Sequence, residues 1–145
     1  MLKHHPLHPI LIHFPIAFLT AASLCDLATL FGYTSAWPVT YPLLGLGVIT
    51  ALIAMMAGLF DLANIERNED IEKTANLHMI LMGCAWCLYL TALLLRNDQM
   101  QITAKPIISS IICSSLGFIT LCLGGLYGGR LVYYHGASVR KPPTR

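Results

Sequence analysis

Four long apolar runs, separated by short polar stretches, dominate the sequence. They cover residues 9–31, 41–63, 77–95 and 106–129, and the last can stay helical to residue 135. A helix needs about 20 apolar residues to cross the hydrocarbon core of a bilayer, so each run is long enough for one span. Connections this short force consecutive helices to run in opposite directions. The pattern therefore predicts an all-α fold, an integral membrane four-helix up-down bundle.

The same pattern predicts a single transmembrane domain over residues 1–145, with short N- and C-terminal tails. No internal repeat and no separate soluble domain is expected. The first run is interpreted as an uncleaved span, because it is longer than the apolar core of a signal peptide and lacks a small-x-small cleavage site.

The composition favours a membrane protein over a soluble one. Apolar residues make up 56% of the chain and charged residues 11%, whereas soluble domains carry about 25% charged residues. The net charge is only +2, and no basic block accompanies aromatic residues, so nucleic acid is not an expected partner. The five cysteines lie inside the apolar runs, where we expect small buried hydrophobic side chains and not a disulfide framework.

Basic residues are distributed unevenly between the two ends of the predicted bundle. Both termini and the 64–76 loop fall at one end, with seven of the nine Lys and Arg residues, while Arg96 and Lys105 fall at the other. Segments on the cytoplasmic side of a membrane are enriched in Lys and Arg. The distribution predicts a membrane protein with both termini in the cytoplasm.

All six histidines fall at the end that holds the termini. They are His4, His5, His8 and His13 before or within the first span, His78 at the start of the third, and His135 at the close of the fourth. Polar side chains inside apolar runs are unfavourable and often functional, which singles out His13 and His78. The simpler alternative for each histidine is an interfacial side chain whose polar end reaches water.

Three glycines share a face of the fourth span with a histidine. At about 100° per residue, Gly117, Gly124, Gly128 and His135 project in nearly the same direction. A glycine face can admit a flat cofactor against the helix backbone. It can equally serve close packing of another helix.

Histidines from several helices at one depth are typical ligands of haem b or of a metal ion. In the first hypothesis, His13 and His78 are the axial ligands of one haem b, His8 and His135 support or replace them, and the glycine face holds the ring. In the second hypothesis, a zinc, copper or iron ion is bound by His8, His13, His78 and His135, with Asp61 as an additional ligand. In the third, the chain is a structural membrane subunit without a cofactor.

Asp26 is the acidic residue deepest in the apolar runs. An acid inside a span is a functional candidate, and the alternative is a structural ion pair with Arg96 or Lys105. No nucleophile–base arrangement or phosphate-binding loop is visible, so any enzymatic activity would depend on a cofactor. The expected partners are the lipid bilayer, a quinone or redox protein, and a second copy in a homo-oligomer.

Two motifs resemble those of the bacterial membrane proteins grouped as domain of unknown function 2231. They are HPILIHFPIA at residues 8–17 and GGLYGGRLVYYHG at residues 124–136, and His78 matches a further histidine of that family. The resemblance covers residues 4 to 139. Some members carry Rieske or c-type cytochrome domains, so the resemblance implies a role in electron transfer and favours haem over a bare metal ion.

Overall fold

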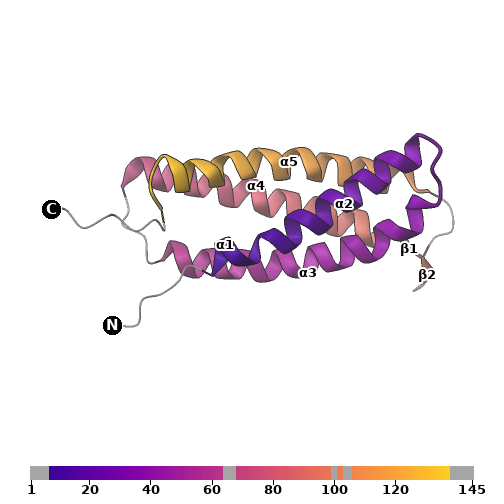
Figure 1. The fold of residues 1–145 in the computed structure, drawn as a ribbon, viewed down its shortest axis with the longest axis horizontal. Coiled ribbons are helices and arrows are strands. Elements are labelled where there is room, and N and C mark those ends of the chain that lie inside the picture. The colour runs from indigo at the N-terminus through magenta and orange to yellow at the C-terminus, as the bar shows by residue number, and fades with distance from the viewer. Residues whose placement is uncertain (1–6, 64–67, 99–100, 103–105, 138–145) are drawn as a thin grey trace.

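Four long helices run along the long axis of the molecule (Figure 1), in a computed structural model that describes residues 7–63, 68–98, 101–102 and 106–137. The elements are α1 (His8–Leu11), α2 (His13–Leu30), α3 (Ala36–Leu62), α4 (Glu69–Leu94), β1 (Asn97–Asp98), β2 (Gln101–Ile102) and α5 (Ile108–Tyr133). The strands are two residues each and pair antiparallel. We call the end where α1 begins and α5 ends the histidine end, and the opposite end the strand end.

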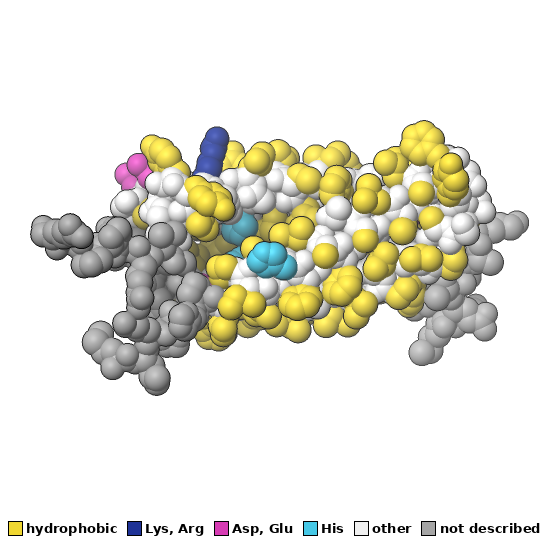
Figure 2. Space-filling model, in the orientation of Figure 1, with side chains coloured by type: hydrophobic (Ala, Val, Ile, Leu, Met, Phe, Trp, Pro, Cys, Tyr) yellow, Lys and Arg dark blue, Asp and Glu magenta, His cyan; other side chains and the backbone are white. Residues whose placement is uncertain are grey.

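The predicted all-α four-span bundle is confirmed. Four segments are long and apolar enough to cross a membrane: His8–Leu30, Ala36–Leu62, Glu69–Leu94 and Ile108–Tyr133. Figure 2 shows hydrophobic side chains over the whole middle of the visible face, with charged ones only toward the histidine end. Large apolar side chains such as Ile53 and Phe60 point outward, as expected where the solvent is lipid.

The third span begins eight residues earlier than its apolar run. Asn68 stands before α4 and its side-chain oxygen accepts a hydrogen bond from the Ile71 N–H at 2.9 Å. Three acidic residues follow in the first turn, where the positive end of the helix dipole favours them. These polar residues belong to the helix because capping, rather than apolarity, sets its start.

The first span is broken between α1 and α2. Pro15 has no N–H to donate to the carbonyl of Leu11, and a proline ring clashes with the carbonyl four residues before it. Accordingly α1 ends at Leu11 and α2 begins at His13.

The two halves of the chain show local sequence similarity at a shift of 70 residues, which the expectation of no internal repeat overlooked. A shift of 70 residues aligns LHPIL at residues 7–11 with LHMIL at residues 77–81, and LGVIT at residues 46–50 with LGFIT at residues 116–120. We call α1, α2 and α3 the first hairpin, and α4 and α5 the second hairpin. In this alignment α2 corresponds to α4, and α3 to α5.

Equivalent residues of the two hairpins meet along the centre of the bundle. The ring centres of His8 and His78 lie 6.4 Å apart, the Tyr89 hydroxyl lies 3.5 Å from the Leu19 carbonyl oxygen, and Arg96 binds Asp26. In each pair the two members are separated by 70 residues. Contacts between equivalent residues are typical of a pseudo-two-fold axis, and these three indicate one along the centre of the bundle.

The buried core lies on this axis. Leu19, Ala22, Leu44, Tyr89 and Ala92 form its main cluster. Ala22 and Ala92 are equivalent positions and are both fully buried. Small residues here let the two hairpins approach closely, which is how helices associate in a membrane.

Candidate functional site

The two equivalent histidines meet at the histidine end of the axis. His8 is the first residue of α1, in the first hairpin. His78 lies in the third turn of α4, in the second hairpin. Their ring centres are 6.4 Å apart and the ring planes are inclined at 82°. Both side chains are half-buried. Histidine side chains border a recess in the surface at this end of the molecule (Figure 2).

Each of the two rings is fixed by a hydrogen bond to a backbone carbonyl. The Nδ1 atom of His8 lies 2.7 Å from the Ala54 oxygen, and the Nδ1 atom of His78 lies 2.8 Å from the Gly124 oxygen. A carbonyl only accepts, so in both rings Nδ1 carries the proton. In a neutral imidazole this leaves the lone pair on Nε2, the arrangement usual in histidines that bind a metal.

A glycine underlies each ring. A Cβ atom added to Gly58 would lie 3.0 Å from the His8 ring, and one added to Gly128 would lie 2.9 Å from the His78 ring. Gly58 and Gly128 are equivalent in the repeat, as are Ala54 and Gly124. Each hairpin thus provides the same three parts, a histidine, a carbonyl and a glycine. Sequence reasoning missed Ala54 and Gly58, although the 70-residue repeat carries the signal for both.

The other predicted ligands take different positions. His13 is exposed and its Nδ1 bonds the Ile10 carbonyl of its own segment at 3.2 Å, so His13 and His78 are not the pair that the structure brings together. The Nε2 atom of His135 lies 3.3 Å from the Thr74 hydroxyl. An Asp61 carboxylate oxygen accepts the His8 backbone N–H at 3.1 Å. His4 and His5 lie outside the described residues.

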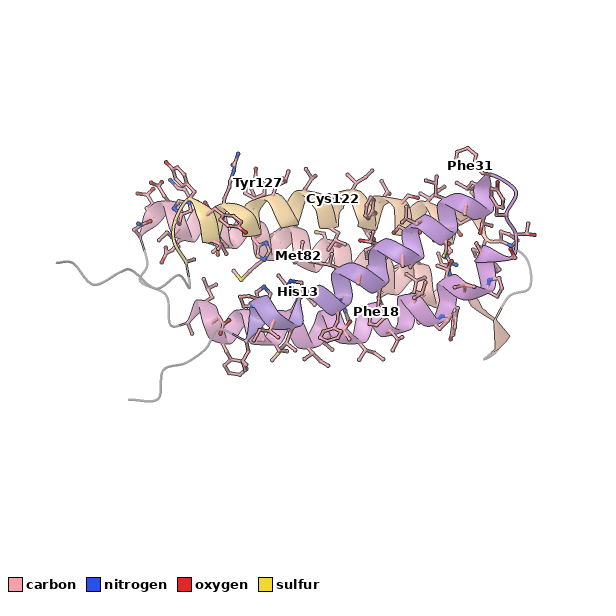
Figure 3. All side chains as sticks on the ribbon, in the orientation of Figure 1. His13, Phe18, Phe31, Met82, Cys122 and Tyr127 are labelled. Carbon is pink, nitrogen blue, oxygen red and sulfur yellow. The ribbon has the colours of Figure 1, made fainter. Side chains whose placement is uncertain are left out.

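The glycine face of α5 is occupied by side chains of α4. Tyr89 packs on Gly117, Met82 on Gly124 and His78 on Gly128. Figure 3 labels Met82 on α4 and His13 on α2, both toward the histidine end. The face thus serves close helix packing, and at Gly128 it also seats one of the paired histidines.

Within the residues that the structure describes, no three His, Cys, Asp or Glu side chains gather closely enough to hold a metal ion. The five cysteines form no disulfide. A structural zinc centre usually has four protein ligands and a catalytic one three, and His8 and His78 are two residues.

A second polar cluster lies on the axis at the strand end. Arg96 donates to both carboxylate oxygens of Asp26, at 2.7 and 2.6 Å, and its Nε donates to Ser110 at 2.8 Å. Ser114 also donates to Asp26, and the guanidinium lies 4.0 Å from the ring centre of Trp37. Asp26 and Arg96 are both fully buried. This is the ion pair that Asp26 was expected to form if its role is structural.

Comparison with known proteins identifies the family to which the chain belongs. No curated protein and no solved structure matches the chain. The family described as predicted membrane protein (DUF2231) matches residues 4–141, almost the whole sequence. That match agrees with the four apolar helices and with the two sequence motifs at the histidine end. The chain belongs to this family of predicted membrane proteins, DUF2231.

Proposed function

We propose that this protein is a membrane electron-transfer protein that binds one haem b between its hairpins, with His8 and His78 as axial ligands. The observation that carries the proposal is the pair of histidines on the axis, each with Nδ1 hydrogen-bonded to a carbonyl and Nε2 left for a metal. The sequence hypothesis named His13 and His78 as the pair of ligands, and in this proposal His8 takes the place of His13.

The separation of the two rings suits a shared ion. An imidazole nitrogen binds a metal at about 2.0–2.1 Å and the ring centre lies roughly 1.2 Å further, so two rings on opposite sides of one ion have centres about 6.4 Å apart. The centres of the His8 and His78 rings are 6.4 Å apart. Two rings sharing a tetrahedral ion would be closer, at about 5.2 Å.

The number of ligands also favours haem over a bare ion. The described residues supply two histidines at this place and no third ligand. A porphyrin provides four nitrogen ligands of its own, so two axial histidines complete its iron. The surroundings include Met82 and the glycines of α3 and α5, and the Asp61 carboxylate lies at the His8 backbone.

The haem would supply one-electron transfer at its iron. The residues of this chain have the remaining tasks. The Ala54 and Gly124 carbonyls hold the two imidazoles in the tautomer and orientation needed for binding. A membrane quinone or a redox protein would exchange electrons at the histidine end. The excess of Lys and Arg at that end supports placing it on the cytoplasmic side of the inner membrane.

The proposal is tested by purifying the protein in detergent from cells supplied with haem. We expect about one iron per chain and a sharp α-band after reduction with dithionite. His8→Ala and His78→Ala should each lose the α-band or most of the bound haem, because each removes one of only two ligands. Added imidazole should restore part of it if the lost group is a ligand and not only a packing residue.

His13→Ala is the matched control. His13 lies on the same span, but it is exposed and bonded within its own segment, so this variant should keep the full spectrum. A wild-type protein without iron or absorption above the protein band would refute the haem proposal. Stoichiometric zinc or copper in its place would favour a metal-ion site, and His13→Ala losing the haem would return the ligand role to His13.

A further inference from the structure

Gly58 and Gly128 have a feature that general helix packing does not require. Each stands four residues after the carbonyl that a histidine bonds, Gly58 after Ala54 and Gly128 after Gly124. In an α-helix the Cα–Cβ bond tilts toward the N-terminus, so a side chain covers the turn before its own Cα. A residue with a Cβ at either position would therefore cover the carbonyl that the imidazole must reach.

We propose that Gly58 and Gly128 are positioning residues of the paired-histidine site, equivalent in function as they are in sequence. Each glycine leaves one carbonyl accessible. An imidazole from another helix can therefore approach the backbone and donate its Nδ1–H to that carbonyl. The added Cβ would approach the His8 ring to 3.0 Å and the His78 ring to 2.9 Å. Contacts this short would push the ring away from the carbonyl. The hydrogen bond that keeps the proton on Nδ1 would then be lost.

The repeat supports the equivalence of the two glycines. His8 and His78 occupy the same position in their copies, as do Ala54 and Gly124, and Gly58 and Gly128. The two hydrogen bonds differ in length by only 0.1 Å, at 2.7 and 2.8 Å. Two copies of one unit have thus kept the same local geometry across the axis. The site is pseudo-symmetric, and neither histidine is the principal ligand.

The inference rests on the proposed function for its meaning, but its first test needs no haem. Histidine labelled with ¹⁵N in the haem-free protein reports by NMR which ring nitrogen carries the proton. We expect His8 and His78 as neutral rings protonated at Nδ1, assigned by their loss in His8→Ala and His78→Ala. Gly58→Ala should change the signals of His8, and Gly128→Ala those of His78. Either histidine protonated at Nε2 in the wild type would overturn the inference without any variant.

The second readout is haem affinity. Removing a group that orients a metal-binding histidine commonly lowers metal affinity by about 10–100-fold, and we expect that loss for Gly58→Ala and for Gly128→Ala, within about threefold of each other. Gly45→Ala in α3 and Gly125→Ala in α5 are controls, because an added Cβ meets nothing within 4 Å at either position.

The outcomes separate this inference from the haem proposal. If the wild type binds no haem but the NMR signals behave as expected, the haem proposal fails and the positioning role stands. If haem binds and the Gly58 and Gly128 variants match their controls in both readouts, the positioning role fails. A loss in only one of the two variants would overturn their equivalence.

Discussion

Replacing Asp26 by alanine is expected to lower the free energy of unfolding by about 3–5 kcal/mol, the range for breaking a buried ion pair. The variant leaves the Arg96 guanidinium fully buried without the carboxylate that binds it at 2.6–2.7 Å. Arg96→Ala should cost a similar amount, because it also removes the contacts with Ser110 and Trp37. Unfolding by SDS in mixed micelles, followed by circular dichroism, measures both.

Lys73→Ala is the control for this prediction. Lys73 and Glu69 form an exposed pair one turn apart in α4, and such pairs contribute about 0.3–0.5 kcal/mol. The combined exchange Asp26→Arg with Arg96→Asp should recover part of the loss, since the two positions face each other across the pseudo-two-fold axis. Single variants of Asp26 or Arg96 as stable as Lys73→Ala would contradict the role assigned to the ion pair.

Replacing Gly117 by valine is expected to destabilise the bundle by about 2–3 kcal/mol, toward the upper part of the range for overpacking a core. A Cβ at this position would lie 3.1 Å from the Tyr89 ring. Tyr89 is fully buried and its hydroxyl is 2.9 Å from the Ser23 hydroxyl, so the ring has little freedom to move aside. The same SDS titration reports the change.

Gly125→Val provides the comparison within the same helix. It adds the same side chain to α5, but a Cβ at Gly125 meets no atom within 4 Å. Because both variants change helix propensity equally, their difference measures the packing of α5 against α4. Equal stability of the two variants would show that α4 does not pack on Gly117 as described.

The fold was predictable because lipid imposes a simple rule on the sequence. Each span needs about 20 apolar residues, and the four apolar runs locate the four helices. Helix ends were less predictable. The start of α4 depends on the cap at Asn68, which stands outside the apolar run. Helix α3 begins at Ala36, before Pro42, so it includes residues that precede the apolar run at residues 41–63.

The candidate site was predictable only in part. His78 was singled out by its place inside an apolar run, but the same argument favoured His13 over His8. In the structure His8 lies beside His78 and His13 is exposed, although both belong to the first span. An apolar run gives the depth of a residue but not the direction of its side chain, so the sequence pattern did not identify the pair.

The repeat was hidden by the composition of the chain. The two stretches that match between the halves are each five residues long and consist mainly of Leu, Ile and Gly. These residues are abundant in any membrane helix. The contacts between residues 70 positions apart reveal it. The partner of Asp26 was among the alternatives expected, because Arg96 stood at the same end of the predicted bundle.

The spin state of the ferric iron tests the central claim most directly. If His8 and His78 bind the haem iron as proposed, electron paramagnetic resonance of the oxidised wild-type protein should give a low-spin signal, because two imidazoles would be its ligands. The signal should be strongly anisotropic, with one large g value, since the planes of His8 and His78 are inclined at 82°. In His8→Ala and His78→Ala, any haem that stays bound should give a high-spin signal. A high-spin wild type, or a low-spin signal that survives unchanged in His8→Ala, would contradict the claim that these two histidines share one iron.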